Sequence, residues 1–147
     1  MRKILTDAER YAYAAGMLDG DGCIMIYLDS FGKYRAVIKV KNTNKDVIIW
    51  LNDNFGGSIH TNKMHNPKWK DDYDWMLYAV DDISKFITNV YPYLIIKLKQ
   101  AQTLLFFLNR EYNDNGERWF KEMKELNKKG KPDGSSADVR EAERNTS

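Results

Sequence analysis

Two aspartates, Asp19 and Asp21, lie in the segment AAGMLDGDG (residues 14–22), where small and apolar residues give way to glycines. The pattern before them predicts a helix over residues 7–19 that begins after Thr6 as the N-cap. Carboxylates near a helix C-terminus are unfavourable, because the helix dipole places partial negative charge there. A divalent cation would offset that charge.

Three interpretations compete for these two acids. The most common fate of an Asp-Gly pair is a turn in which the aspartate bonds nearby backbone. An EF-hand loop that starts at Asp19 is excluded, because its sixth position is Ile24 instead of glycine and its twelfth is Ser30 instead of glutamate. A divalent-cation site is the third. The charge at the helix end does not rank Asp19 against Asp21.

The helix before the acids is built from small residues, namely Ala12, Ala14, Ala15 and Gly16. Glycine inside a helix costs about 1 kcal/mol relative to alanine. Small side chains allow a second helix to approach closely. No other helix of this kind occurs in the sequence, so the expected partner is the same helix of a second copy. A two-fold axis between the copies would bring two Asp21 side chains together as a shared metal site.

Apolar periodicity predicts the elements that position these residues. We expect strands over residues 23–29, 34–41, 58–64 and 73–80, and further helices over residues 45–55, 82–91, 100–112 and 118–129. The order αββαββα predicts an α+β fold, with a four-stranded antiparallel sheet and the helices on one face. Residues 1–129 form one domain, and residues 130–147, which have few large apolar side chains, are expected to be a flexible tail.

Composition excludes several classes of protein. The 147 residues carry a net charge of only +2, so the distribution of charge matters more than the total. The single cysteine, Cys23, excludes an intramolecular disulfide, and it forms no zinc-ligand pattern with the two histidines. No apolar run approaches the roughly 20 residues that a membrane helix needs. We expect a soluble intracellular protein without a membrane partner.

The second strand alternates in a way that predicts a basic face on the sheet. Its two faces are formed by Lys33, Arg35, Lys39 and Lys41 on one side and by Tyr34, Ala36, Ile38 and Val40 on the other. The same alternation assigns further residues to the basic face: Ser58, His60 and Asn62, and then Tyr27, Asp29, Asp74 and Met76. An ordinary solvated face is the alternative. Cations for phosphates and polar groups for base edges favour DNA binding.

A second EF-hand-like sequence spans residues 111–122, EYNDNGERWFKE. Asn113, Asn115, Gly116 and Glu122 fit the pattern, whereas Glu111 and Trp119 do not. The Asn-Asp-Asn-Gly run is more often a simple turn between helices, and this is the interpretation that we favour.

The sequence resembles the LAGLIDADG family of homing endonucleases in two separate segments. AAGMLDGDG matches the family motif outright at Ala15, Gly16, Asp19, Asp21 and Gly22, with Ala14 in place of the leading leucine and Gly20 in place of alanine. YPYLIIKLKQAQTLL (residues 91–105) looks like the family's later Pro-x-Leu-x-x-Lys-x-x-Gln-Ala pattern. The resemblance covers roughly residues 7 to 112.

The resemblance implies a homodimer of two such units, which cuts both strands of a near-palindromic DNA target across the minor groove. The sheet of each unit would saddle the major groove, and the motif helices would form the dimer interface through Ala12, Ala15, Gly16 and Asp19. Asp19 would be structural, capping or bonding across that interface. A non-cutting protein on the same fold is the alternative: an RNA maturase with its host intron RNA as partner, or a DNA-binding regulator.

The resemblance also assigns catalytic roles. Asp21 and the Gly20 carbonyl would bind Mg²⁺, for which Mn²⁺ would substitute. Lys97 would offset the charge that develops on the phosphate, and Asn42 would organise active-site water.

Overall fold

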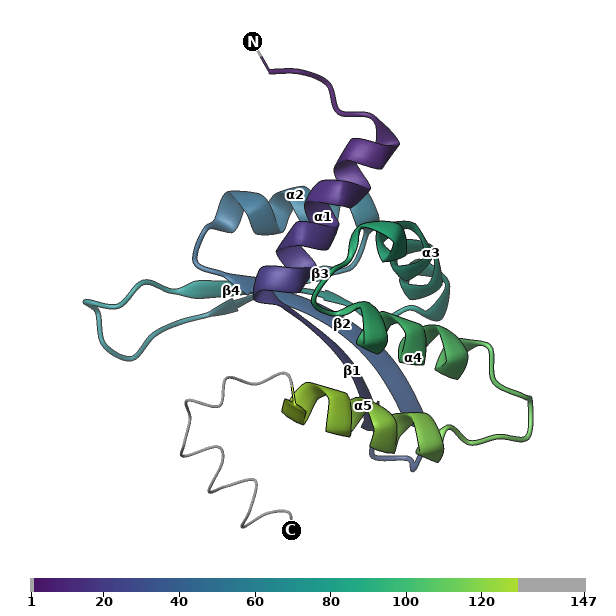
Figure 1. Cartoon of the computed structure of the whole chain (residues 1–147). Coiled ribbons are helices and arrows are strands. Elements are labelled where there is room, and N and C mark those ends of the chain that lie inside the picture. The colour runs from purple at the N-terminus through teal and green to yellow at the C-terminus, as the bar shows by residue number, and fades with distance from the viewer. Residues whose placement is uncertain (1, 130–147) are drawn as a thin grey trace.

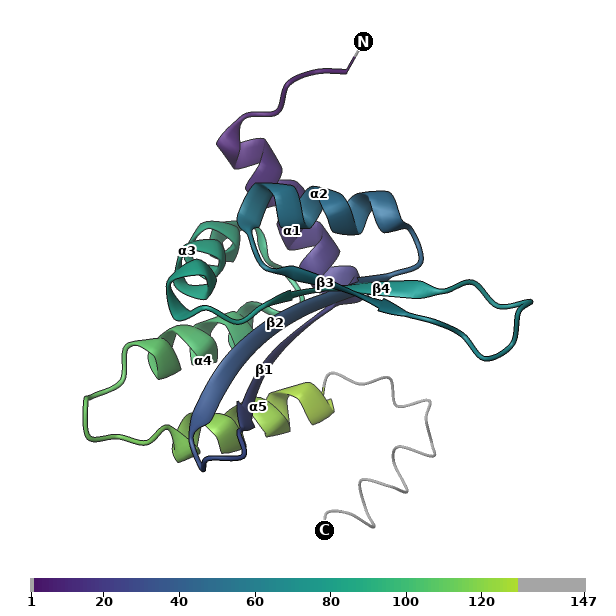
Figure 2. The ribbon, with the colours of Figure 1, turned by 180° about the vertical axis from the view of Figure 1, so that it is seen from behind.

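The computed structural model describes residues 2–129 (Figures 1 and 2). The expected tail over residues 130–147 lies outside the described residues. In chain order the elements are α1 (Asp7–Asp21), β1 (Gly22–Leu28), β2 (Tyr34–Asn42), α2 (Lys45–Phe55), β3 (Ser58–Asn62), β4 (Asp72–Leu77), α3 (Val80–Val90), the 3₁₀ turn η1 (Tyr91–Tyr93), α4 (Leu98–Leu108) and α5 (Glu117–Lys129). The predicted α+β order is confirmed.

The four strands form one antiparallel sheet in the order β1-β2-β4-β3. Two hairpins therefore lie side by side and are joined through β2 and β4. The sheet is curved, with α1, α2, α3 and α4 on one of its faces (Figures 1 and 2). The residues of β2 that were expected to face the helices, Ala36, Ile38 and Val40, are buried in the core.

The core lies between that face of the sheet and the helices. Trp75 from β4 is fully buried against Phe55 and Phe86, and its indole Nε1 donates to the Gly56 carbonyl at 2.7 Å. The indole ring is thus removed from water, and its buried N–H group still has a hydrogen-bond acceptor. Leu18, with 0% exposure, packs α1 against this core.

The predicted helix starts are confirmed where a capping side chain marks them. The Thr6 hydroxyl accepts from the Glu9 backbone amide at 3.1 Å, and the Glu9 carboxylate accepts from the Thr6 backbone amide at 2.9 Å. Together the two bonds form a capping box. The Asn44 side chain caps α2 with a single bond, accepting from the Val47 amide at 3.3 Å. Boundaries without such a signal shifted: the helix expected over residues 100–112 is Leu98–Leu108, and the last strand ends at Leu77 instead of residue 80.

Residues 111–116 form a turn, and the calcium interpretation is wrong. The Asp114 carboxylate accepts from the Gly116 amide at 2.8 Å, and the Asn115 side chain accepts from the Glu117 amide at 3.0 Å at the start of α5. Glu122 accepts from the Thr103 hydroxyl on α4 at 2.9 Å. These oxygens start and attach α5 instead of converging on an ion.

Helix α5 packs against α4 and along β1, at the outer edge of the sheet. The Asn127 amide donates to the Ile24 carbonyl of that edge strand at 3.0 Å, and Met123 is buried in the core. An uncovered edge strand is a template for unwanted pairing, so α5 protects the sheet.

Candidate active site and sheet face

Asp21 is the last residue of α1, two residues beyond the predicted end of the helix, and the chain enters β1 directly at Gly22. Gly22 is extended, with φ −103° and ψ 176°, so it does not adopt the left-handed conformation common at helix ends. A Cβ here would lie 2.8 Å from both the Cα and the carbonyl oxygen of Leu18. Glycine is required because the strand leaves so close to the last helical turn. The Asp21 side chain is exposed.

Asn42, the last residue of β2, lies beside Asp21. Its amide Nδ2 donates to the Asp21 Oδ2 at 2.9 Å, while its Oδ1 accepts from the Asn44 backbone amide at 2.7 Å. The second bond fixes which end of the side-chain amide faces the carboxylate. Asn42 therefore restrains the orientation of Asp21, a contact more direct than the water-organising role expected from the resemblance.

Asp19 and Lys97 form a reciprocal clasp between α1 and the start of α4. The Asp19 carboxylate accepts from the Ile95 amide at 2.8 Å and from the Lys97 amide at 3.0 Å. The Lys97 ammonium in turn donates to the Asp19 backbone carbonyl at 2.9 Å. These bonds of Asp19 are made within its own chain, because the 95–97 segment lies against the end of α1. The two bonds to the Asp19 carboxylate satisfy backbone amides at the start of α4.

The clasp also places each charged group next to the end of a helix dipole of opposite sign. The ammonium of Lys97 lies at the negative end of the α1 dipole, and the carboxylate of Asp19 lies at the positive end of the α4 dipole. Each placement is favourable by about 0.3–1 kcal/mol at exposed sites. Lys97 occupies the N-cap position of α4, where the dipole alone would disfavour a cation, and its bond to α1 compensates.

The oxygen donors of one chain are too few to hold a metal ion by themselves. Among residues 2–129, no cluster of three or more His, Cys, Asp or Glu side chains could bind one. Asp21 supplies one carboxylate. The Gly20 carbonyl belongs to the last helical turn, whose carbonyls lack intrahelical donors. Mg²⁺ is typically bound by one or two carboxylates together with substrate phosphates. The donor types fit Mg²⁺ if a second chain and DNA complete the set.

The face of the sheet opposite the core carries most of the side chains predicted for it. Across the sheet, Lys39 pairs with Cys23 and Met76, and Met76 pairs with Ser58. A second row joins Lys41, Asp74 and His60. Tyr27, Arg35 and Asn62 follow the same alternation. Sequence analysis did not identify an apolar position on this face: Val37, 3% exposed, pairs with Met25 in the middle of the basic face.

Asp29 and Lys33 are exceptions to that alternation, because both lie outside the strands in the β1–β2 turn. The Asp29 carboxylate accepts from the backbone amides of Phe31 and Lys33 at 2.8 and 2.9 Å, and it also accepts from the Arg35 guanidinium. Strand parity does not apply to residues in a turn. The expectation that alternation orients them is wrong, and Asp29 builds the hairpin.

The Asp29–Arg35 contact predicts an acid-sensitive hairpin. The hydrogen bond from Arg35, followed by the Lys33 amide, holds the pKa of the Asp29 carboxyl below its ordinary value of 3.8. A depressed folded-state pKa contributes stability above the unfolded value that is lost as pH falls through the folded value. We expect urea unfolding to show wild type more stable than Asp29→Asn by a constant amount down to about pH 5, with the difference shrinking below about pH 4. A difference that grows in acid would contradict this assignment.

The face is chemically mixed around β4. The Asn62 amide bridges two acids, donating to Asp72 at 2.8 Å and to Asp74 at 3.0 Å, and the Lys41 ammonium lies 3.9 Å from each acid. Asp74 is 7% exposed, and its Oδ1 has no hydrogen-bond partner. Asp72 was missed because the strand was predicted to begin one residue later. The charge of Lys41 is therefore partly offset.

Comparison with known proteins adds the family context. No family model and no curated protein matches the sequence. Solved structures do match: the homing endonuclease I-CvuI in complex with its target (TM-score 0.64, 20% identity, 84% of this chain and 81% of that chain) and the archaeal intron-encoded homing endonuclease I-Vdi141I complexed with DNA (TM-score 0.62, 19% identity, 84% of each). The LAGLIDADG homing endonuclease I-GzeII, also in complex with DNA, matches over 79% of this chain and 43% of its own, with a TM-score of 0.59 and 20% identity.

The chain has the LAGLIDADG homing endonuclease fold. Helix α1 carries most of the segment AAGMLDGDG, which resembles the family motif, and we call it the motif helix. The fold accounts for the proximity of Asp21, Asn42 and Lys97, which come from three distant segments of the chain.

The motif helix presents a stripe of small residues to solvent. Ala12, Gly16 and Gly20, spaced four residues apart, are all exposed. A Cβ at either glycine would meet nothing within 4 Å, so packing within this chain does not require glycine there. Ala15 is different: with 0% exposure it packs into the core of its own chain, so its expected place on the dimer interface is wrong. It shares the inner side of the helix with Leu18.

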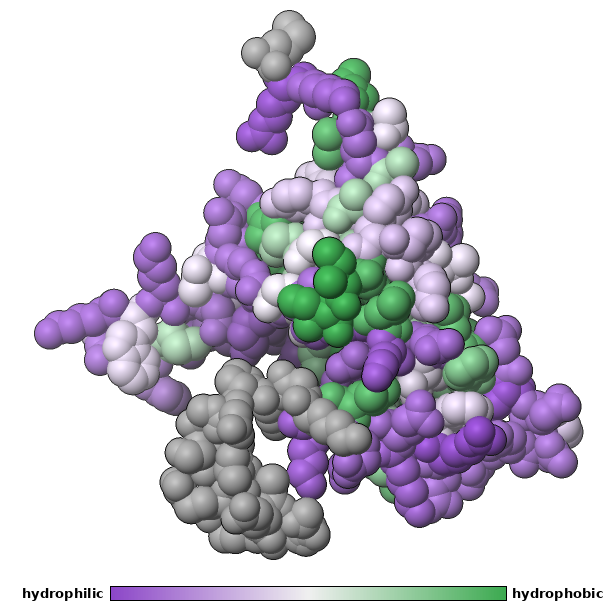
Figure 3. Space-filling view, in the orientation of Figure 1, coloured by the Kyte–Doolittle hydropathy of each residue, from purple (hydrophilic) through white to green (hydrophobic). Residues whose placement is uncertain are grey.

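Apolar side chains also gather beside the C-terminal part of the motif helix (Figure 3). They belong to the segment before α4, where Ile95 is 85% exposed and Ile96 is 68% exposed. Isolated exposed apolar residues are common on proteins, but adjacent ones beside a small-residue stripe are typical of an interface. Sequence analysis did not identify these two isoleucines, because Lys97 was the only residue of this segment to which it gave a role.

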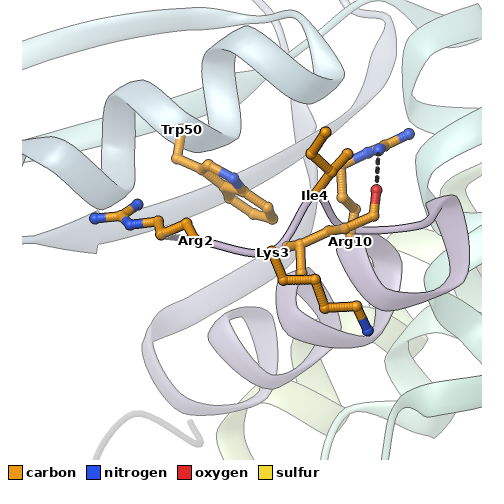
Figure 4. A pocket seen from close by; sticks show the side chains of 6 residues that line it. Arg2, Lys3, Ile4, Arg10 and Trp50 are labelled. Carbon is orange, nitrogen blue, oxygen red and sulfur yellow. Dashed lines mark hydrogen bonds between the residues drawn. The ribbon is translucent and has the colours of Figure 1, made fainter.

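A pocket of about 420 Å³ lies at the opposite end of the motif helix from Asp21 (Figure 4). It is lined by Arg2, Lys3, Ile4, Leu5, Arg10 and Trp50. Arg10 donates to the Leu5 carbonyl at 3.0 Å, which attaches the N-terminal segment to the helix. The length of α1, about 22 Å, separates this pocket from the candidate site.

Over the described residues, no helix combines the length and the apolar character needed to cross a membrane.

Proposed function

We propose that this protein is a site-specific DNA endonuclease that works as a homodimer and cleaves both strands of a near-palindromic duplex by Mg²⁺-dependent hydrolysis. The observation that carries the proposal is the convergence of Asp21, Asn42 and Lys97 at the end of the motif helix. That end adjoins a sheet face that carries lysine, arginine and base-reading polar groups. The fold, shared with enzymes solved on DNA, supports it.

The homodimer rests on the exposed stripe of the motif helix. The glycines at 16 and 20 each cost about 1 kcal/mol in helix propensity, and no contact within the chain compensates. A second motif helix packed against the stripe would supply that compensation through close backbone contact. The exposed Ile95 and Ile96 beside it add apolar area to the same surface.

The proposed chemistry divides between the metal and the side chains. Mg²⁺ bound by Asp21, by the Gly20 carbonyl and by their counterparts in the second copy would activate water and stabilise the leaving oxygen. Asn42 holds the Asp21 carboxylate in one orientation. The ammonium of Lys97, fixed by the Asp19 carbonyl, provides positive charge near the scissile phosphate. Mn²⁺ is expected to replace Mg²⁺, because it accepts the same oxygen ligands.

A selection experiment tests the proposal. A library of randomised duplexes is incubated with the full chain and Mg²⁺, and the broken ends are sequenced. We expect one near-palindromic family of sites, cut in both strands. Absence of strand scission, with Mg²⁺ and with Mn²⁺, would contradict the nuclease assignment.

A non-cutting nucleic-acid binder is the second candidate, and one observation favours it. The carboxylate of Asp21 and the ammonium of Lys97 both have hydrogen-bond partners within the chain, so their presence has a purely structural explanation. Host intron RNA is the partner expected for a maturase of this fold. Tight RNA binding without DNA scission in the selection would favour this candidate.

Asn42→Ala tests the positioning role of the side-chain amide. A hydrogen bond to a charged group contributes about 1.5–3 kcal/mol, so losing it should slow cleavage by roughly 10- to 100-fold. DNA affinity should stay nearly constant, because both ends of the Asn42 side-chain amide are bonded within the chain, to the Asp21 carboxylate and to the Asn44 amide. Single-turnover cleavage with a gel-shift titration measures both quantities. An equal loss of affinity would instead make Asn42 a DNA contact.

A further inference from the structure

The connection between β3 and β4 projects well beyond the sheet (Figures 1 and 2). We call residues 63–71 the β3–β4 loop. Its exposed side chains include Lys63, Lys68 and Lys70, and Trp69 is 61% exposed. Among the described residues, none of these three ammonium groups pairs with a carboxylate, in contrast to Lys41 on the sheet. The loop is thus a basic surface with an uncovered aromatic ring.

The loop is ordered by its own hydrogen bonds. The Asn66 side chain accepts from the Lys68 amide at 2.9 Å, and the Asn66 carbonyl accepts from the Trp69 amide at 2.9 Å. At its base, the Asp71 carboxylate accepts from the Met64 amide at 3.0 Å. The Asp71 carboxylate is therefore bonded to backbone. The turn at Asn66 holds Lys68 and Trp69 near the tip of the loop, whereas Lys63 and Lys70 lie next to its base.

Strand register places this loop at the catalytic end of the sheet. Asn62 and Asp72, which border the loop, pair with each other, and Asn42 pairs with Tyr73 next to them. Asn42 is the residue that bonds Asp21. The β1–β2 turn leaves the sheet at the opposite end. In a complex in which the sheet lies on DNA, the loop would reach the duplex near the cleavage position and not at its outer ends.

We propose that the β3–β4 loop is a second DNA contact, in which Lys63, Lys68 and Lys70 bind backbone phosphates near the scissile bonds and Trp69 packs on the adjoining deoxyribose. This rests on the proposed function. Unpaired lysines in a structured loop match the charge of the phosphate backbone. An exposed tryptophan between two of them supplies apolar contact to a surface that is both charged and partly apolar.

The salt dependence of binding tests the lysines. The probe is a random-sequence duplex in EDTA, which prevents cleavage and needs no known target. Each phosphate contact contributes about 0.9 to the slope of log affinity against log salt, so removing three lysines in each of two subunits should flatten it by about 2 to 5. The triple variant is Lys63→Ala, Lys68→Ala, Lys70→Ala. The control, Arg2→Ala, Lys3→Ala, Lys85→Ala, removes the same charge far from the site and should leave the slope unchanged.

Tryptophan fluorescence tests the location of Trp69. Acrylamide quenching is measured with and without the duplex in wild type and in Trp69→Phe, and the difference isolates this one tryptophan of the four. We expect Trp69 to become protected on DNA binding. Unchanged quenching in the bound protein, or equal slopes for the two triple variants, would overturn the loop contact while the proposed function stands. A triple variant that loses its dimer but keeps its slope would assign the loop to the second copy and overturn it too. Absence of any DNA binding by wild type would overturn both.

Discussion

Asp21→Asn abolishes DNA cleavage, by about 10³-fold or more, and leaves DNA affinity nearly unchanged. The expected size follows from losing a charged metal ligand, since each tenfold loss in rate corresponds to about 1.4 kcal/mol of transition-state stabilisation. The asparagine still has an oxygen that can accept from the Asn42 amide, so the local structure should survive. The selected duplex serves for cleavage and for a gel-shift titration.

Stability separates this prediction from a structural role for Asp21. Neutralising the carboxylate relieves its repulsion by the end of the α1 dipole, about 0.3–1 kcal/mol, but it also weakens the Asn42 hydrogen bond by a similar amount, so the free energy of unfolding should stay within about 1 kcal/mol of wild type. A structural Asp21 would instead make the variant less stable by more than that. Asp53→Asn is the matched control, because Asp53 is also an exposed acid in the last turn of a helix, α2. It should relieve the same helix-dipole repulsion and keep full cleavage. An Asp21→Asn variant that is destabilised by clearly more than about 1 kcal/mol, or one that still cuts, would contradict the metal-ligand assignment.

Gly16→Leu should yield a folded monomer that does not cleave. A Cβ at Gly16 meets nothing within 4 Å, so a leucine fits on the surface of the isolated chain. It should even stabilise α1 by about 0.5–1 kcal/mol, because leucine is a far better helix former than glycine. On a dimer axis, however, two leucines would separate helices that can approach closely only through small residues.

Sedimentation equilibrium and thermal unfolding measure the two halves of this prediction. Thr88→Leu, which adds the same side chain to an exposed position on α3, is the control and should remain dimeric and active. A dimeric, active Gly16→Leu would place the interface elsewhere. A misfolded one would show that α1 lacks the free face seen here.

Local signals in the sequence were sufficient for most of the fold. Capping side chains such as Thr6 and Asn44 fixed helix starts, because the bond that each makes is local. Alternation in β2 separated the core from the outer face, because a strand has a strict two-residue period. Alternation failed for Asp29 and Lys33, where the chain had already left the strand.

Tertiary contacts account for what sequence reasoning could not supply. The small residues of α1 suggested a common stripe, but helical geometry places Ala15 toward the core and Ala12 and Gly16 toward solvent. The clasp between Asp19 and Lys97 joins segments far apart in sequence, so no local pattern reveals it. The charge at the helix end did not distinguish Asp19 from Asp21. The family resemblance implies that Asp19 is the structural acid. In the structure, the Asp19 carboxylate accepts from the Ile95 and Lys97 amides, which are contacts that a structural residue would make.

Mapping the breaks in both strands of the selected duplex tests the central claim most directly. Two Asp21 side chains beside one two-fold axis predict one break in each strand, at positions related by the symmetry of the target and facing each other across the minor groove. Both breaks should require Mg²⁺ or Mn²⁺ and disappear together in Asp21→Asn. A duplex that is bound but left intact, or broken in one strand only by a monomer, would contradict the account.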